Sequence, residues 1–321
     1  MEENRIYLSV VIPVFNEQDN LTELFKRILN ICGSLNFSYE IIFVDDGSID
    51  KSLSILKDIS KNNNKVKVIS FKKNFGQTAA LSAGIDYARG EVIVSLDADL
   101  ENDPNDIPLL LNELNHGFDV VSGWRKERWL NKIFTRRFTS QTANWLISKI
   151  AGLKLHDYGC TLKAYRRDVI KNINLYGEMH RFIPALAFWQ GAKVKEIEVN
   201  YKPRQFGKSK YGLGRTFNVL LDLVTLKFLS GYAAKPIYFF GKIGFISIFL
   251  GFLTFLWATY YKIIGRSDYI QTPLPVVVVL FVVLAVLLIL IGLLAEMIMR
   301  SYHESNDKKV YLIKEKINIK D

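Results

Sequence analysis

The chain has 321 residues, of which 49% are hydrophobic and 13% aromatic, and its formal net charge is +10 at pH 7. This composition excludes a disordered chain, because disordered segments are poor in aromatic and β-branched residues. The basic excess leaves nucleic acid, anionic lipid and phosphorylated substrates as partner classes, and the positions of the charges have to decide between them.

Between Leu8 and Ser122 the chain alternates between β-branched and amphipathic runs. The β-branched runs predict strands over residues 8–14, 39–44, 66–71, 91–96 and 119–123. The amphipathic runs predict helices over residues 20–32, 50–60, 76–88 and 105–115, with Asn20, Asp50 and Asn105 as N-caps. This alternation predicts an α/β domain whose mostly parallel sheet is covered by helices on both faces.

Polar and aromatic residues collect where these strands end. In chain order they are Phe15, Asn16 and Glu17; Asp45 and Asp46; Lys72, Lys73 and Asn74; Asp97 and Asp99; Trp124 and Arg125. Ligands of such sheets bind beyond the carboxyl ends of the strands. Any one group would be an ordinary turn or cap, but five groups at one edge predict a site.

The segment VSLDADLEND, residues 94–103, ends the fourth strand with four acids at alternate positions. Alternate residues of an extended segment share a face, so Asp97 and Asp99 can reach the same cation. Carboxylate oxygens suit Mg²⁺ or Mn²⁺, which also bind substrate phosphates. The alternative for a lone pair of this kind is a strand-end turn, and Asp103, next to Pro104, fits that alternative better.

A basic segment, KPRQFGKSKYGLGR, covers residues 202–215. In this segment, Arg204 could bind two phosphate oxygens at once through its guanidinium group, and Lys210 could bind phosphate as a single positive charge. The alternatives are a solvated basic face or attraction to anionic lipid. Nucleic acid is a poor explanation for the charge, because this segment leads toward two membrane-spanning runs.

Two uncharged runs, residues 243–261 and 269–295, predict transmembrane helices. The linker between them holds one arginine, whereas several lysines and arginines lie outside both runs, so the positive-inside rule places both termini in the cytoplasm. Before the first run, residues 211–232 form an amphipathic pattern that predicts a helix in the membrane interface or one packed on the domain. The predicted organisation is a cytosolic domain over residues 1–211, an amphipathic juxtamembrane helix over 212–235, a transmembrane hairpin over 236–300 and a cytosolic tail over 301–321.

Cys32 and Cys160 are the only cysteines. Two distant thiols in a cytosolic domain predict buried, reduced packing residues. The four histidines show no metal-ligand spacing.

Several motifs, in this order, resemble family 2 glycosyltransferases of the GT-A fold. They are SVVIPVFNE, EIIFVDDGS, NFGQTAALSAGID, VSLDADLEN, and DYGCTLKAYRR paired with RQFGKSKY. More narrowly, they look like the polyprenyl-phosphate glycosyltransferases: dolichol-phosphate mannose synthase, bacterial glucosyl carrier enzymes and undecaprenyl-phosphate formamido-arabinose transferase. The resemblance implies a Rossmann-like GT-A domain followed by interfacial amphipathic helices and two transmembrane helices.

The resemblance also implies roles for individual residues. It assigns the nucleotide of the donor to Pro13, Phe15, Glu17, Val44 and Asp46. It assigns the donor sugar-diphosphate and its Mg²⁺ or Mn²⁺ to Asp97, Ala98 and Asp99, with Glu101 as a further metal ligand where relatives usually carry Gln. It assigns donor or acceptor phosphates to Arg125, Arg204, Ser209 and Lys210. Asp157 matches an acid near the acceptor, as a base or a phosphate orienter, and its alternative is an Asx-turn.

The implied reaction is attack by the phosphate of a polyprenyl phosphate on the anomeric carbon of a nucleotide-diphosphate sugar, with inversion. Asp99, Arg204, Lys210 and Asp157 are its expected catalytic residues. The product would be a polyprenyl-phosphate monosaccharide for cell-envelope glycan or lipid modification. The resemblance favours UDP over GDP, an inner or plasma membrane location and, since related membrane enzymes often assemble, a homo-oligomer.

Three other functions stay open at this point. A processive polysaccharide synthase shares the sheet motifs but would carry QxxRW, which the ERW at residues 127–129 does not match. A transferase acting on a protein or a soluble sugar is the second. A non-enzymatic membrane scaffold or lipid carrier is the third, and it leaves the paired carboxylates without a purpose.

Overall fold

The structure is a computed structural model that describes residues 5–129, 147–149, 151–175, 177, 179–203, 236–265, 268–304 and 311–319. The chain divides into two compact units. The first comprises Met1–Leu220 together with Lys309–Asp321, and the second comprises Leu221–Lys308. The predicted amphipathic helix over residues 212–235 lies outside the described residues and stays a prediction.

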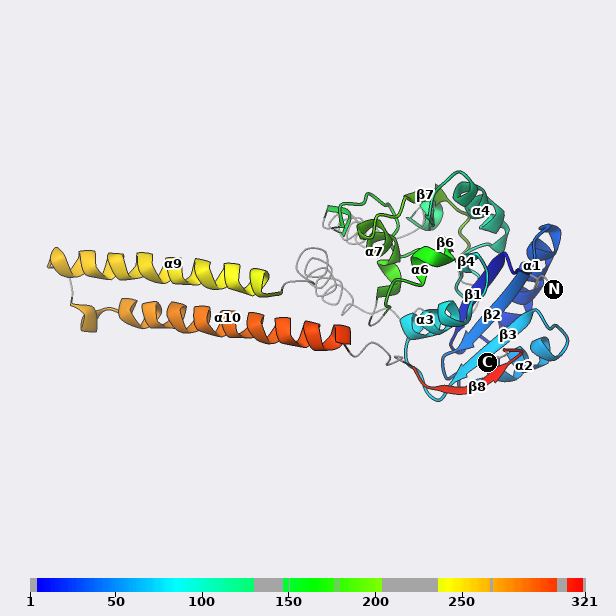
Figure 1. The fold of residues 1–321 in the computed structure, drawn as a ribbon, viewed down its shortest axis with the longest axis horizontal. Coiled ribbons are helices and arrows are strands. Elements are labelled where there is room, and N and C mark those ends of the chain that lie inside the picture. The colour runs from blue at the N-terminus through cyan, green and yellow to red at the C-terminus, as the bar shows by residue number, and fades with distance from the viewer. Residues whose placement is uncertain are drawn as a thin grey trace. The chain divides into compact units, whose positions relative to one another are not determined.

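A mixed sheet forms the centre of the first unit (Figure 1). Its strands are β1 Leu8–Val14, β2 Tyr39–Asp45, β3 Val66–Phe71, β4 Val92–Ser95, β5 Val120–Trp124, β6 Lys163–Arg166, β7 Val194–Glu198 and β8 Ile313–Ile317. They lie in the order β7-β5-β6-β4-β1-β2-β3-β8. β1 is parallel to β2 and β4, and β2 is parallel to β3. β6 is antiparallel to both β4 and β5, so these two strands point the same way and all five predicted strand ends face one edge.

Helices cover both faces of this sheet. They are α1 Leu21–Ser34, α2 Ser52–Lys61, α3 Gln77–Tyr87, α4 Ile107–Asn115, α6 Arg167–Ile170 and α7 Ile183–Trp189, with short 3-10 turns η1 Pro104–Asp106, η2 Lys126–Trp129 and η3 Met179–Arg181. Val10 and Ile12 of β1 share a core cluster with Leu24 of α1. Val11 points to the other face, where a Cβ on Gly84 of α3 would lie 2.2 Å from its Cγ1. Glycine therefore sets how closely α3 packs on β1.

The helix starts differ from the predicted caps. Asp103, not Asn105, caps the turn before α4, since its side chain accepts a hydrogen bond from the Asn105 backbone N–H. Asn20 precedes α1 without a side-chain capping bond. Lys51, not Asp50, is the N-cap residue of α2, although Asp50 accepts a hydrogen bond from the Ser52 backbone N–H. The proline after Asp103 shifts the start of the turn by two residues, because its ring is pre-set for the first helical position.

Both cysteines are free and buried, which confirms the prediction of packing residues. Burial raises the pKa of the Cys32 thiol to about 12 and that of Cys160 to about 11. Neither thiol is therefore a reactive thiolate near neutral pH.

The C-terminal segment adds an edge strand that the sequence analysis treated as a tail. β8 pairs antiparallel with β3, with Val68 opposite Ile317 and Ser70 opposite Glu315. Lys57 of α2 forms an ion pair of 2.8 Å with Glu315. The chain that follows the apolar helices therefore belongs to the same sheet as the chain that precedes them.

The second unit contains two helices that are long and apolar enough to cross a membrane, Pro236–Ile263 (α9) and the Leu274–Ala295 part of α10 (Leu274–Glu304). A 3-10 turn, η4 Tyr269–Gln271, precedes α10, so the second span starts later than predicted. The helices approach closely at small residues: the Ser247 hydroxyl donates to the Phe281 carbonyl at 2.9 Å, and a Cβ on Gly251 would lie 3.1 Å from Phe281 Cβ. Such contacts are typical of packed membrane helices.

Candidate functional site

A cavity of about 340 Å³ lies at the carboxyl ends of β1, β2 and β4 and beside the start of α3. Its lining residues are Pro13, Val14, Phe15, Glu17, Asp46, Asn74, Gly76, Gln77, Asp97, Ala98 and Asp99. The structure thus brings four of the five predicted strand-end groups to one cavity. Of the residues that the resemblance assigns to the nucleotide and the sugar-diphosphate of the donor, all line it except Val44, which is fully buried opposite Pro13 in the sheet. The fifth group lies elsewhere, and Trp124 stacks on His156 at 4.2 Å.

The second and third strand-end loops are joined by Asp46. Its two carboxylate oxygens accept hydrogen bonds from the backbone N–H groups of Phe75 at 2.7 Å and Gly76 at 2.9 Å. Burial raises the pKa of Asp46, and these two amides oppose the rise. The next residue, Gly47, has φ +70°, and a Cβ there would lie 2.5 Å from the Lys73 carbonyl carbon. Only glycine therefore allows the two loops to approach this closely.

The paired carboxylates of the DAD segment lie in the cavity wall. Asp97 Oδ1 accepts from Gln77 Nε2 at 2.7 Å, and Asp99 Oδ1 accepts from the Glu101 backbone N–H at 3.0 Å. Burial and, after it, the neighbouring Asp99 raise the pKa of Asp97 to about 7. Asp99 is buried, Asp97 is half-buried and Gln77 is neutral, so a divalent cation would relieve the repulsion between the two carboxylates. Two carboxylates beside an open cavity suit a cation that takes its other ligands from substrate phosphates and water.

Glu101 faces another partner. Its Oε2 lies 3.4 Å from Arg125 Nη1. Within the described ranges, no group of three or more His, Cys, Asp or Glu side chains is arranged to hold a metal ion. Among the residues that the structure describes, no third carboxylate joins Asp97 and Asp99 in such a group, and Glu101 as a metal ligand stays a prediction.

Arg125, directly after β5, and Asp157, in the loop before β6, form a buried ion pair. Arg125 Nε donates to Asp157 Oδ2 at 2.9 Å and its Nη2 to Oδ1 at 3.3 Å, and both side chains are 3% exposed. Burial acts to raise the pKa of Asp157, but Arg125 more than offsets it, so the pKa is lowered. An acid with a lowered pKa is a weak proton acceptor. These contacts favour Asp157 as an orienter of Arg125 over Asp157 as a base.

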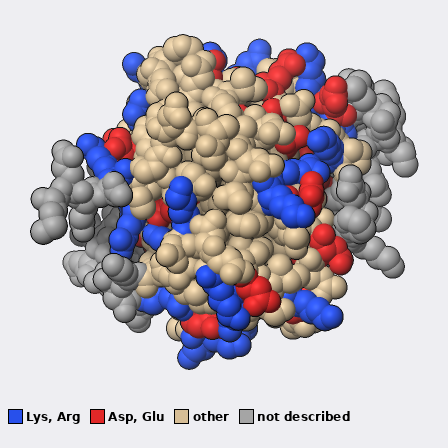
Figure 2. All heavy atoms as spheres, turned by 90° about the vertical axis from the view of Figure 1, so that its right-hand side faces the viewer, with Lys and Arg blue, Asp and Glu red and all other residues tan. Residues whose placement is uncertain are grey.

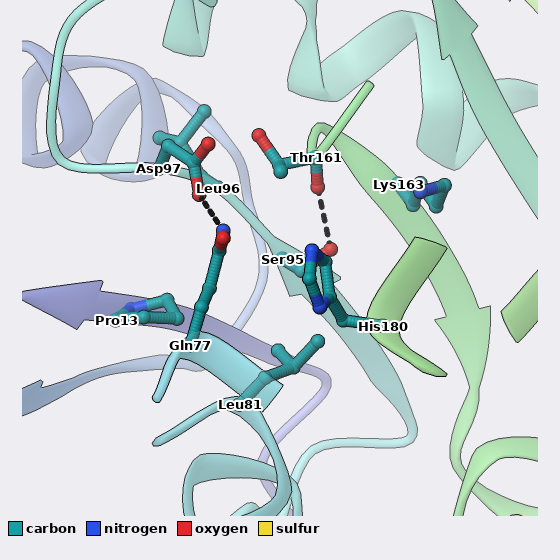
Figure 3. A pocket seen from close by; sticks show the side chains of 9 residues that line it. All are labelled: Pro13, Gln77, Leu81, Ser95, Leu96, Asp97, Thr161, Lys163 and His180. Atoms are coloured by element: carbon teal, nitrogen blue, oxygen red, sulfur yellow. Dashed lines mark hydrogen bonds between the residues drawn. The ribbon is translucent and has the colours of Figure 1, made fainter. Parts of the chain in front are cut away.

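A smaller cavity of about 10 Å³, room for one water-sized group, adjoins the first and shares Pro13, Gln77 and Asp97 with it (Figure 3). Lys163 of β6 also lines it, and burial lowers the pKa of this ammonium to about 8. His180 lines this smaller cavity too, and its Nδ1 lies 2.7 Å from Thr78 Oγ1. Burial lowers the pKa of His180 to about 3.

The sequence analysis missed Gln77, Lys163 and His180. A lysine inside the strand-like run TLKAY was a usable signal, because buried lysines are rare. Gln77 and His180 carried no such signal.

The basic segment after β7 begins beside the DAD segment. Lys202 donates from Nζ to Asp103 Oδ2 at 2.8 Å and from its backbone N–H to the Glu101 carbonyl at 2.9 Å. Asp103 thus caps the turn η1 and pairs with Lys202, and it does not line the cavity. Arg204, Ser209 and Lys210 lie outside the described residues, so their phosphate-binding roles stay predictions.

Figure 2 shows one face of the molecule on which Lys and Arg side chains alternate with Asp and Glu. Nucleic-acid binding surfaces carry basic patches or stripes of one sign. This face therefore does not resemble such a surface.

Comparison with known proteins identifies the family. The model of "Glycosyl transferase family 2" matches residues 9–173. The chain belongs to this glycosyltransferase family. It is 41% identical over 312 residues to dodecaprenyl-phosphate galacturonate synthase of Rhizobium johnstonii, covering 96% of this chain and 92% of the relative. It is 36% identical over 309 residues to undecaprenyl-phosphate 4-deoxy-4-formamido-L-arabinose transferase of Edwardsiella ictaluri, covering 96% and 93%.

Among solved structures, glucosyl-3-phosphoglycerate synthase from Mycobacterium tuberculosis, in complex with Mn²⁺, UDP and glucosyl-3-phosphoglycerate, superposes with a TM-score of 0.54. It is 16% identical and covers 70% of this chain and 80% of its own. At this identity the likeness shows the fold alone. It confirms the predicted GT-A architecture of this family 2 glycosyltransferase.

Proposed function

We propose that this glycosyltransferase transfers a sugar from a nucleotide-diphosphate sugar to the phosphate of a membrane polyprenyl phosphate, with inversion. The observation that carries the proposal is the pair Asp97 and Asp99 in the wall of a cavity of about 340 Å³. The near full-length similarity to two polyprenyl-phosphate sugar transferases supports the acceptor class. The two apolar helices would keep the enzyme at the membrane where such an acceptor lies.

The donor would occupy the cavity with its nucleotide toward Pro13, Phe15, Glu17 and Asp46 and its diphosphate toward Asp97 and Asp99. These two carboxylates fit Mg²⁺ or Mn²⁺, and a bound cation would supply charge neutralisation for the departing nucleoside diphosphate. Val44 would support the nucleotide site indirectly, by packing beside Pro13, because it pairs with Pro13 in the sheet and has no exposed surface. UDP as the nucleotide rests on the family resemblance.

The acceptor phosphate would attack the anomeric carbon, forming a bond from its oxygen to that carbon while the bond from the carbon to the diphosphate oxygen breaks. A phosphate monoester has a second pKa of about 6, so it is mostly a dianion at pH 7 and needs little help from a base. Arg204, Ser209 and Lys210 would hold this phosphate. Arg125, oriented by Asp157, would supply a further positive charge to the diphosphate or phosphate.

The pairing of β8 with β3 supports the proposed topology. The chain leaves the first unit, passes through two candidate spans and returns to the same sheet, so both segments must lie on one side of a membrane that the two helices cross. The positive flanks of the hairpin support a cytoplasmic location for this side. A homo-oligomer remains part of the proposal by family resemblance.

The test uses the purified full-length chain with a short polyprenyl phosphate, Mg²⁺ and a panel of labelled UDP- and GDP-sugars. We expect one label to become extractable into organic solvent only when the polyprenyl phosphate is present. Asp99→Asn serves as the matched inactive control. Label that enters the organic phase without polyprenyl phosphate, or in equal amount with Asp99→Asn, would contradict the proposal, and label that stays on protein or soluble glycan would favour a different acceptor.

A further inference from the structure

Tyr311 is a buried aromatic residue of the C-terminal segment. It is 4% exposed although it lies at the sheet edge, just before β8. Its ring stacks on Phe71 of β3, with 5.1 Å between centroids and an interplanar angle of 12°. Its hydroxyl donates to Asp86 Oδ2 of α3 at 2.6 Å. Tyr311 therefore ties the segment after the membrane helices to both β3 and α3.

Phe71 leads from this contact to the cavity. Its ring meets Phe75 edge-on, with centroids 5.7 Å apart. The backbone N–H groups of Phe75 and Gly76 are the two donors to Asp46, and Asp46 and Gly76 line the cavity. Directly between these contacts, the Lys72 backbone N–H donates to the Leu312 carbonyl at 3.0 Å. The loop after β3 is thus held by Asp46 on its cavity side and by the C-terminal segment on its other side.

Other contacts of β8 and of Asn318, which follows it, are made with α2 and with the start of β3. Asn318 Nδ2 donates to the carbonyl oxygens of Ser60 and Val66 at 2.8 and 2.9 Å. Glu315 pairs with Lys57 on α2. These contacts attach the strand to the sheet without touching the loop that carries Phe75, so they offer a control for general loss of stability.

We propose that Tyr311 is a positioning residue for the donor cavity, through which the segment after the transmembrane hairpin holds the loop of residues 72–76 in its binding conformation. The inference rests on the proposed function only in naming the donor as the ligand of this cavity. A loop that is already ordered loses less conformational entropy on binding, so its support strengthens nucleotide binding without touching the nucleotide. The acceptor phosphate, held by other residues, would not sense this support.

The experiment compares Tyr311→Ala, Tyr311→Phe and Glu315→Gln in the full-length protein. One readout is hydrogen exchange of peptides that cover residues 72–77, and the second is KM for the donor sugar nucleotide and for the polyprenyl phosphate. For Tyr311→Ala, we expect exchange of that loop and the donor KM to rise about 10-fold, since both the ring stacking and a hydrogen bond are lost. For Tyr311→Phe, which keeps the stacking, we expect a rise of about 3-fold.

Glu315→Gln is expected to leave the loop exchange and the donor KM unchanged, even if its melting temperature falls. The inference is overturned if Tyr311→Ala changes neither readout, or if it raises acceptor KM as much as donor KM. It is also overturned if Glu315→Gln matches Tyr311→Ala in loop exchange. Should Tyr311→Ala fail to fold, Tyr311→Phe carries the same test with the smaller expected change. Loop exchange needs no substrate, so a wild-type protein without transferase activity would refute the proposed function and still decide this inference.

Discussion

Two groups of carboxylates near the end of β4 are both at least partly shielded from water, which makes their negative charge costly, but they differ in the groups that offset this cost. Asp97 and Asp99 line a cavity, and the partner of Asp97 is the neutral amide of Gln77. Asp157 and Glu101 instead face the guanidinium of Arg125. Accordingly, the pKa of Asp97 is raised to about 7 by burial and by Asp99, whereas the pKa of Asp157 is lowered because Arg125 outweighs its burial.

The difference separates a binding group from a positioning group. Two neighbouring carboxylates that raise each other's cost of ionisation are stabilised by a proton or by an incoming cation. A carboxylate that already holds an arginine in two-point contact needs neither. This contrast supports the proposal of cation and diphosphate binding for the first group and of orientation of Arg125 for the second.

The largest effect that would sharpen this comparison is expected from Asp99→Asn. Removing one charge from the cavity pair should lower kcat/KM by about 100- to 1000-fold, the range seen when a group that stabilises developing charge is removed. Steady-state transfer of labelled sugar measures it. Asp103→Asn, four residues away but paired with Lys202 outside the cavity, is the matched control and should retain most activity. Comparable turnover of Asp99→Asn and wild type in saturating Mn²⁺ would break the assignment.

The second effect concerns stability. Arg125→Met leaves Asp157 buried without its cation and should lower the unfolding free energy by about 3–5 kcal/mol, as for other broken buried pairs. Asp157→Asn keeps a hydrogen-bonding partner for Arg125, so it should cost less and should weaken transfer without abolishing it. Thermal melting in detergent and transfer assays measure the two effects. Equal melting temperatures for wild type and Arg125→Met would contradict the role of this pair.

The pH dependence of stability should follow Asp157. Its folded pKa lies below the unfolded value of about 3.9, so its contribution is complete above that pH and is lost as the pH falls through the folded pKa. The difference in melting temperature between wild type and Asp157→Asn should thus be constant from pH 7 to about pH 5 and shrink in stronger acid. A difference that grows on acidification would have the wrong sign for a lowered pKa.

Metal affinity offers a further contrast. Asp97 and Asp99 alone supply few ligands, so Mn²⁺ should bind the empty protein weakly and at least about 10-fold more tightly with donor nucleotide, whose phosphates supply further oxygens. Electron paramagnetic resonance of free Mn²⁺ measures both affinities. Equal affinity with and without nucleotide would show that phosphates do not share the cation with this pair.

The smallest effect is expected from Gln77→Ala. It removes one neutral hydrogen bond to Asp97, which should reduce kcat/KM by about 3- to 10-fold. Gln77→Glu is the sharper partner variant, because a third carboxylate beside Asp97 adds repulsion and should cost more. If both variants matched wild type, Gln77 would not support the cavity pair.

Much of the site was predictable where a local pattern sufficed. The β-branched runs located β1 to β5, and the parallel topology brought their polar ends to one edge. β8 was not predicted, although Ile313, Glu315 and Ile317 alternate with two lysines that protect an exposed edge. A strand of five residues with three charges is stable only against a partner, and β3 lies more than two hundred residues away in the chain.

By itself, the sequence determined the family, the order of strands and helices in the first half, the two apolar helices and the placement of Asp97 and Asp99 at a strand end. These features follow from local periodicity and from motifs whose residues are neighbours in the chain. Only the tertiary structure decided that Arg125 pairs with Asp157 and that Tyr311 stacks on Phe71 and donates to Asp86. Such contacts join residues far apart in sequence, because burial forces each charge and each aromatic face to find a partner wherever the packed chain brings one.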